Sequence, residues 1–321
     1  MKIRKRRARG FTLIEMVLAL GLIAILSFSV MGQFSYFSRK NGELATQDRM
    51  ERLREAFTAA YRANARVVEG VAGQSFFLSA SATIANNTDG STALTAAALT
   101  QIAQYGHLSP YEAQHDDFNG FYKILVSNQL STVMPSGYTL FYHKIAIVSP
   151  GYNRHLEAGT TMNAATGALT VAGDDYAVVV DGFQIGRELA EDTVRRVDNL
   201  ANVYQLYFTN RYLANAARDV SIDYFAATGT TAARWDAGGL ASNSSGAFTN
   251  ATSLNMAAAL GLSTTDMQDA YGTSLQIDNS SALARNPDNA TTAMSIPPYS
   301  ALVRANLVAG QTYTRSATGS F

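Results

Sequence analysis

The chain contains no cysteine, a single tryptophan and only four histidines among 321 residues. Without cysteine it can form neither a disulfide nor a thiolate-ligated zinc site, and it has no thiol nucleophile. Basic and acidic side chains number 25 each, so there is no overall positive field that would favour nucleic acid. Catalytic and nucleotide-binding patterns such as GxSxG, HExxH, GxGxxG and the phosphate loop are also missing. We therefore do not expect an enzyme.

What is present is an uneven distribution of charge. Residues 1–10 contain six positive side chains and no acid, and residues 11–38 contain one charged side chain, Glu15. Residues 39–69 carry charges of both signs, and residues 70–321 are acidic overall. With 47% hydrophobic residues, the chain can bury a core, which argues against wholesale disorder. The order is thus a basic end, an apolar segment, a charged segment and a mildly acidic head.

The apolar segment at residues 11–31 is long enough to cross a bilayer. As a helix it would extend roughly 31 Å at about 1.5 Å per residue. The basic residues before it should stay in the cytoplasm and direct the C-terminus outward. A secretory signal peptide would have a shorter apolar stretch followed by a small-residue cleavage site. An ordinary signal anchor fits the length but does not explain Glu15, because a carboxylate in a membrane segment is costly and commonly functional.

Residues 9–15 read RGFTLIE, and this sequence resembles the processing motif of the type IV pilin-like family, the prepilins and the pseudopilins of type II secretion. The resemblance implies that a prepilin peptidase cuts between Gly10 and Phe11 and N-methylates Phe11. It implies further that Glu15 acts in assembly, where it pairs with the terminal amine of a neighbouring subunit. A buried charge is tolerated best when it is paired, so the cost of Glu15 in lipid favours entry into a filament.

The resemblance extends over residues 1 to about 69 and implies an order of domains. Residues 1–10 are a cleaved leader, residues 11–31 the transmembrane and assembly helix, residues 32–68 an amphipathic continuation of this helix, and residues 69–321 an extracytoplasmic head. The implied partners are the prepilin peptidase/methyltransferase, other pilin or pseudopilin subunits, the inner-membrane assembly platform and, before assembly, the lipid bilayer.

The continuation of the helix has apolar residues at helical spacing. This stripe predicts a face that packs on the head. Its members are Leu44, Met50, Leu53, Phe57, Tyr61 and Val68. Many type IV pilins have a proline after the apolar span, whereas this chain has Gly32. Glycine costs about 1 kcal/mol against alanine in a helix, so we expect a continuous helix, with local melting on assembly as the alternative.

The head is expected to be α+β. Strand-like runs occur at 121–126, 138–148, 169–171, 176–180, 220–225 and 299–308, of which the third and fourth are expected to pair. A second long helix is predicted at about residues 185–217, and short helices near 252–260 and 264–270. No internal repeat is visible. Together with the resemblance, these features predict a pilin-like fold, in which the long N-terminal helix packs on an antiparallel sheet, with a large insertion and a second long helix.

Candidate ligands in the head have simpler explanations. Calcium prefers oxygen ligands, which are concentrated at His115, Asp116, Asp117 and Asn119 and again at Asp174 and Asp175. Adjacent acids are more often a solvated turn. We interpret His143, in a strand-like run, as structural in preference to a metal ligand. Trp235 could anchor a partner, but local packing is the favoured explanation. We expect no metal and no cofactor.

The sequence therefore predicts a structural subunit of a type IV pilus or a type II secretion pseudopilus. Before assembly it would be a single-pass protein of the bacterial inner membrane with a cytoplasmic N-terminus, and afterwards part of a periplasmic pseudopilus or a cell-surface pilus. The large head favours a minor, tip-proximal subunit. The alternative is a filament-borne adhesin or DNA-uptake subunit with a ligand-binding head. A membrane-anchored enzyme is a third class, disfavoured by the missing catalytic patterns.

Processing after Gly10 can be tested directly. Glycine has no side chain, so the peptide can lie flat in a protease groove. A Gly10→Leu substitution should therefore leave the full-length chain in the membrane. The intact mass of the membrane-extracted protein identifies the mature terminus. A mature protein that starts at any residue other than Phe11 would contradict the assignment.

Overall fold

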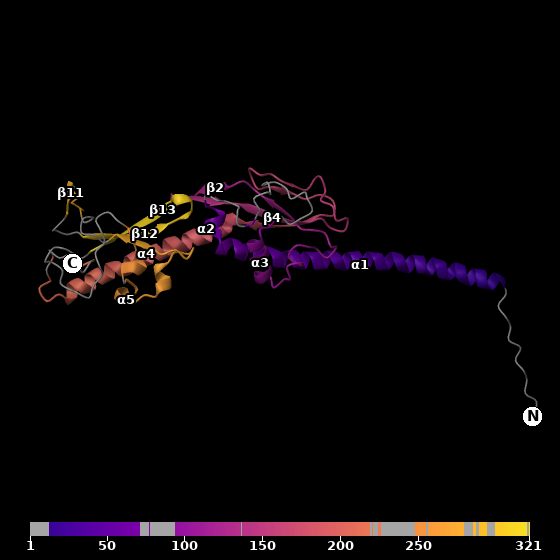
Figure 1. Ribbon diagram of the computed structural model, residues 1–321, viewed down its shortest axis with the longest axis horizontal. Coiled ribbons are helices and arrows are strands. Elements are labelled where there is room, and N and C mark those ends of the chain that lie inside the picture. Colours follow the sequence, from indigo (N-terminus) through magenta and orange to yellow (C-terminus); the bar gives the residue numbers. More distant parts are fainter. Residues whose placement is uncertain are drawn as a thin grey trace, which may run out of the picture.

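The computed structural model describes most of the chain after the basic end. The described residues are 13–70, 77, 94–135, 137–218, 220, 224–225, 248–254, 256–278, 285–286, 289–293, 299–319 and 321. The molecule is elongated, with one long helix projecting from the head and a second long helix running through the far part of the head (Figure 1). Trp235 lies outside the described residues.

The projecting helix, α1 (Leu13–Ala63), continues through Gly32 without a break and is followed by the short helix α2 (Ala65–Val68). This confirms the expected continuous helix. The second half of α1 buries Met50, Leu53 and the residues that follow them on the same face. Leu44 is the exception in the expected stripe. It is 56% exposed, because it lies beside an open groove between α1 and an edge strand.

A three-stranded antiparallel sheet packs on the second half of α1. Its strands are β1 (Lys123–Val126), β4 (Lys144–Ser149) and β7 (Tyr176–Asp181), in the order β1-β4-β7. The helix α3 (Ala96–Tyr105) packs against α1. Its first turn is capped by Thr95, whose side chain accepts a hydrogen bond from Ala98 N. Together these elements enclose one hydrophobic core.

Two hairpins flank this sheet, and they correct two of the expected strand assignments. The hairpins are β2 (Leu130–Val133) with β3 (Thr139–Tyr142) and β5 (Thr161–Met162) with β6 (Leu169–Thr170). The run 138–148 is therefore two strands in different sheets, because His143 N donates to the Tyr61 hydroxyl (3.0 Å) between them. The expected pairing of 169–171 with 176–180 is also wrong. β7 instead pairs with β4, whose inner residues are buried.

The far part of the head is built on α4 (Gly182–Ala214), which begins where β7 ends and confirms the second long helix. A second antiparallel sheet covers it, with strands β8 (Thr249–Asn250), β9 (Gln276–Asp278), β12 (Ser300–Asn306) and β13 (Thr312–Thr318) in the order β13-β12-β9-β8. The shorter elements are the hairpin β10 (Arg285–Asn286) and β11 (Asn289–Ala293), the helix α5 (Met256–Leu260), and the 3-10 helices η2 (Ala251–Leu254), η3 (Thr264–Met267) and η4 (Val308–Gly310).

A strand was expected at 220–225. The described residues of this run, 220, 224 and 225, lie in turns and not in a strand. Tyr224 and Phe225 lie in a turn and are buried in the second core against Phe208. The edge strand β13 was not expected, because its sequence TYTRSAT is largely polar and exposed. Overall, the expected α+β, pilin-like arrangement of a long helix on an antiparallel sheet is confirmed.

The head thus has two parts, each a helix on a sheet. We call the part built on α1 (described residues 44–70 and 94–181) module A. The part built on α4 (described residues within 193–225 and 248–319) is module B. The first three turns of α4 (182–192) connect them. Figure 1 shows module B continuing the long axis of the molecule beyond module A.

A pair of leucine substitutions tests whether α1 belongs to the core of the head. Leu53 is fully buried whereas Leu44 on the same helix is 56% exposed. In a head fragment that begins at Arg39, Leu53→Ala should lower the free energy of unfolding by about 2–5 kcal/mol, and Leu44→Ala by at most about 0.5 kcal/mol. Denaturant unfolding measures both values. Equal losses would show that α1 does not pack on the sheet as described.

Candidate assembly site

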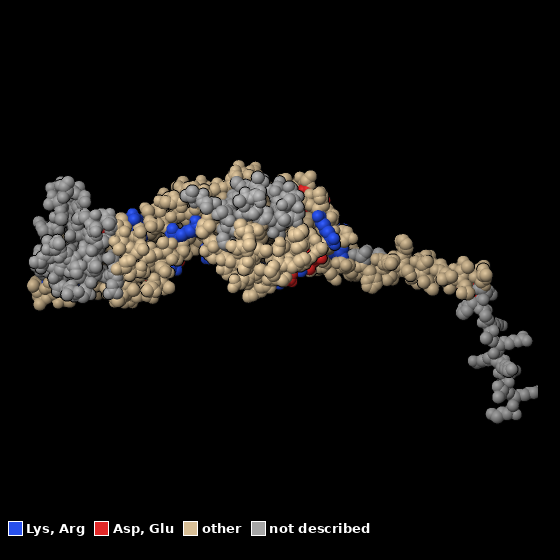
Figure 2. Space-filling model, in the orientation of Figure 1, with Lys and Arg blue, Asp and Glu red and all other residues tan. Residues whose placement is uncertain are grey.

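The first half of α1 is apolar on all of its sides and lies outside the head. The large apolar side chains from Leu13 to Phe37 are all exposed. In the view of Figure 2 this part of α1 projects from the head as a rod with an almost uncharged surface. A helix that is hydrophobic all round is normally buried by surrounding structure. The first half of α1 therefore requires a partner that the head does not supply.

The exposed apolar surface extends beyond the residues singled out from the sequence. Phe34, Tyr36 and Phe37 follow the expected segment and are each more than 60% exposed. The polar residues Gln33 and Ser35 between them obscured this extension in the sequence. Three aromatic residues within four positions were the available signal. The apolar surface ends at Arg39 and Lys40, both paired with Glu43 (3.1 and 3.0 Å).

The site residues expected at the N-terminal end fall partly outside the described residues. Gly10 and Phe11 are among residues 1–12, which are not described. Glu15 lies in the first turn of α1 and is exposed. The N-terminal end of a helix carries partial positive charge, which stabilises a carboxylate there. The described residues contain no helix whose length and hydropathy together suffice to cross a membrane. The membrane topology therefore stays a prediction.

The acidic loop around Asp116 is held by its own hydrogen bonds. One carboxylate oxygen of Asp116 accepts from Phe118 N (3.0 Å) and Gly120 N (2.7 Å), and the other accepts from the Ser149 hydroxyl (2.6 Å). Burial raises the pKa of Asp116, and these hydrogen bonds oppose that shift. The neighbouring Asp117 pairs with Arg49 (2.7 Å). The loop is therefore a structured turn that ties the sheet to α1.

The second acidic pair also has partners within the chain. Asp174 accepts two hydrogen bonds from Asn153, and Asp175 accepts one from Glu157 N (3.0 Å). Within the described ranges, no group of three or more His, Asp or Glu side chains is placed to hold a metal ion. These carboxylates therefore act as turn-forming groups in the described structure.

His143 lies in a buried polar cluster where α1, α2 and the first sheet meet. Its Nδ1 lies 2.9 Å from Glu69 Oε1, and both side chains are almost fully buried. Tyr61 donates a hydrogen bond to the same carboxylate, and Gln129 donates to its other oxygen (3.3 Å). Burial, followed by the Glu69 charge, raises the pKa of Tyr61. His143 thus has the structural role that was expected for it. It belongs to a group of polar side chains that joins the end of the long helix to the sheet.

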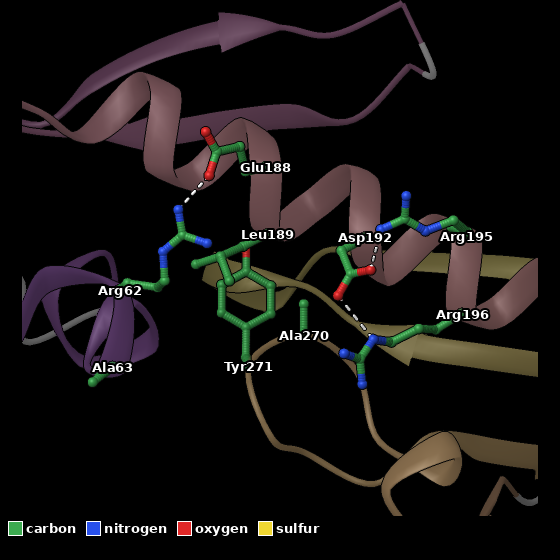
Figure 3. A pocket seen from close by; sticks show the side chains of 9 residues that line it. All are labelled: Arg62, Ala63, Glu188, Leu189, Asp192, Arg195, Arg196, Ala270 and Tyr271. Atoms are coloured by element: carbon green, nitrogen blue, oxygen red, sulfur yellow. Dashed lines mark hydrogen bonds and ion pairs between the residues drawn. The ribbon is translucent and has the colours of Figure 1, made fainter. Parts of the chain in front are cut away.

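A cleft of about 610 Å³ lies where module A meets α4 and the loop at Ala270 and Tyr271 (Figure 3). Its charges pair with one another. Arg62 pairs with Glu188, and Asp192 pairs with Arg195 and with Arg196 (2.9 Å). Burial raises the pKa of Asp192, but the hydrogen bonds and charges of the two arginines outweigh it and lower the pKa. Because each of these groups has a partner and three arginines against two acids leave a net charge of only +1 (3 − 2), the cleft is better explained as a junction than as a ligand site.

Comparisons with known proteins identify the N-terminal motif. A family model described as the prokaryotic N-terminal methylation motif matches residues 5–31. Neither the curated proteins nor the solved structures contain a match to the chain. The motif supports a type IV pilin-like prepilin that is processed by prepilin peptidase and assembles with other pilins. It points to a structural subunit and not to an enzyme.

Proposed function

We propose that the chain is a minor structural subunit of a type IV pilus or type II secretion pseudopilus. It would be anchored in the inner membrane by residues 11–31 with the N-terminus in the cytoplasm, cut between Gly10 and Phe11, and N-methylated at Phe11. The observation that carries the proposal is the methylation motif on a helix whose first half is apolar on every side and projects from the head. In a filament, the equivalent helices of neighbouring subunits would cover that surface.

Glu15 is the proposed docking charge. Its place in the first turn of α1 puts it about four residues after the amine that cleavage would create at Phe11. Residues at that spacing lie on the same side of a helix. In a filament the amine of one subunit would reach Glu15 of its neighbour. This pairing fixes the axial position of one helix against the next, since a charge buried among apolar residues needs a partner.

The shape of the head supports the proposed minor position. Module B extends the head along the axis of the molecule beyond module A (Figure 1). A subunit repeated at every step of a filament must leave room for its neighbours above and below. An elongated head of two modules fits an end of the filament more easily than its interior.

Removal of the Glu15 carboxylate tests the docking charge. Glu15→Ala should leave cleavage after Gly10 intact but reduce incorporation into filaments at least tenfold, because losing one partner of a buried ion pair costs about 3–5 kcal/mol. The amount of the chain in sheared filaments, relative to the membrane fraction, measures the effect. Glu55→Ala is the matched control, since Glu55 is exposed on the outer face of the same helix. Normal incorporation of Glu15→Ala would contradict the assignment.

The stoichiometry of the filament tests the minor position. Quantitative mass spectrometry of sheared filaments should find the chain at a small fraction of the most abundant pilin-like protein. A filament in which this chain is the most abundant subunit would refute the minor role while leaving the processing and assembly proposals intact.

A further inference from the structure

Modules A and B are built on the same plan, although no repeat is visible in the sequence. Each has a long helix packed on an antiparallel meander, β1-β4-β7 in module A and β9-β12-β13 in module B. In each, a hairpin connects the first and second strands of the meander, β2-β3 or β10-β11. A short helical segment precedes the first strand in both, α3 or η2 with α5. The order of these elements is therefore repeated along the chain, and the β5-β6 hairpin of module A and β8 of module B are additions to it.

The two long helices bury the same series of positions. Among the buried residues of α1 the series is Thr46, Met50, Leu53, Phe57 and Tyr61, and among those of α4 it is Thr193, Val197, Leu200, Tyr204 and Phe208; Ala56 and Ala60 of α1 and Ala201 and Tyr207 of α4 are buried beside these series. The spacing between successive members is identical in both series. Each series starts with a buried threonine and ends with two aromatic residues. The helices thus present equivalent faces to their sheets.

The loop before the first strand has the same hydrogen bonds in both modules. Asp269 accepts from Tyr271 N (2.9 Å) and Thr273 N (2.8 Å), as Asp116 accepts from Phe118 N and Gly120 N. The residue at the third position after each aspartate has positive φ, 65° at Asn119 and 76° at Gly272. Asparagine and glycine are the residues that best tolerate this conformation. The loops are DDFNGFY and DAYGTSL, which explains why the sequence did not reveal them.

In both modules, the same two contacts connect the long helix to the loop before the first strand. Thr46 Oγ1 accepts from Asp117 N (3.3 Å), and Thr193 Oγ1 accepts from Ala270 N (3.2 Å). An arginine follows each of these threonines three positions later, Arg49 in α1 and Arg196 in α4. Arg49 Nη1 donates to His115 O (3.1 Å), and Arg196 Nη1 donates to Gln268 O (3.3 Å). Repeated side-chain contacts in the same register indicate a duplicated unit, because a shared architecture alone does not require them.

The short helices that precede the loops, α3 in module A and α5 in module B, are followed by the same local structure. A residue with positive φ follows each helix, His107 at 49° and Gly261 at 66°. Two residues further on, a serine exchanges hydrogen bonds with an acid three positions later. These capping boxes are Ser109 with Glu112 and Ser263 with Asp266. The correspondence between the modules therefore covers the helix, its cap, the loop and the sheet.

Module B and the connecting first three turns of α4 together cover the end of module A. Ile185 and Leu189, in the first three turns of α4, are buried in the core of module A. Ala190 and Leu307 pack with Met134, Tyr138 and Leu140 of the β2-β3 hairpin. Without module B, this end of module A would expose an apolar patch. A patch of this kind with a polar rim is typical of a protein–protein interface.

The rim of this covered end is formed by paired polar groups. Arg66 pairs with Asp269 and stacks on Tyr271 at 5.0 Å, and Arg62 pairs with Glu188. Gln311 exchanges two hydrogen bonds with the backbone of Thr139 (2.8 and 2.6 Å). The described C-terminal turns of α4, at the opposite end of module B, do not repeat these arginines at the corresponding positions. The positions of α4 that correspond to Arg62 and Arg66 are Thr209 and Leu213.

We propose that the head is a tandem duplication, and that module B occupies the end of module A where the head of a neighbouring pilin-like subunit would otherwise bind. The interaction surface is the patch around Met134, Tyr138 and Leu140 with its arginine rim. Its partner is a helix-on-meander module, supplied here by the same chain. This proposal rests on the proposed function. Neighbouring subunits would bind along the first half of α1, and no further head would bind beyond module B.

Two single-cysteine variants of the full-length chain test this arrangement, because the natural chain has no cysteine. Phe37→Cys lies on the projecting half of α1 and Leu213→Cys on the far end of module B, at positions that are 61% and 52% exposed. Both are expressed with the other subunits, labelled at the new thiol with a maleimide–benzophenone and irradiated, so that the benzophenone inserts into a C–H bond of whichever chain lies beside it. Phe37→Cys should form crosslinks to other pilin-like subunits. Leu213→Cys should give no more product than the cysteine-free parent.

The outcomes separate the two proposals. Crosslinks from Leu213→Cys to another pilin-like head would overturn the capping role and leave the proposed function standing. An absence of crosslinks from both positions would overturn the proposed function and with it the capping role.

The division of the head into two modules has an independent test in the same full-length chain. Leu53→Ala and Leu200→Ala remove equivalent, fully buried side chains from the two modules. In hydrogen exchange, each should accelerate exchange mainly in its own module. Acceleration across both modules by either variant would show that the head is one cooperative unit and not two modules.

Discussion

The structure depends on how the two halves of α1 are covered. The second half buries one face against α3 and the first sheet, while its other faces carry charge. The first half is apolar on every side and is covered by nothing in the described head. A single continuous helix therefore joins a folded domain to a surface that is stable only in lipid or against other chains. The processing by prepilin peptidase and the assembly with other pilins that the methylation motif supports both concern this uncovered first half.

Much of the architecture could be predicted from local sequence. The N-terminal motif, the continuous α1 and the period of α4 depend on residues close together in the chain, and the structure bears out both helices. Strand pairing was harder, because it depends on distant partners. The run 138–148 reads as one strand, yet the Tyr61 hydroxyl accepts a hydrogen bond from His143 N and divides it. Leu44 fits the helical stripe, but it remains exposed because an open groove separates α1 from the edge strand β7 at this level.

The duplication was invisible in the sequence for a physical reason. What the modules share is largely backbone geometry and the polarity of a few positions. An aspartate that caps a loop, a threonine that accepts from a backbone N–H and an arginine that donates to a carbonyl are spread over long intervals. The core residues between them need only be apolar and of suitable size. Such a pattern constrains too few residues to be recognised as a repeat, although it fixes the same contacts twice.

The account is tested most directly by the solvent accessibility of α1 in the assembled filament. Leu26→Cys reports on the projecting half, and Val133→Cys reports on an exposed strand of the head; the natural residues are 60% and 71% exposed in the isolated chain. In sheared filaments treated with a water-soluble maleimide, we predict labelling at position 133 and protection at position 26. Labelling of position 26 at the same rate as position 133 would contradict burial of the projecting half by neighbouring subunits.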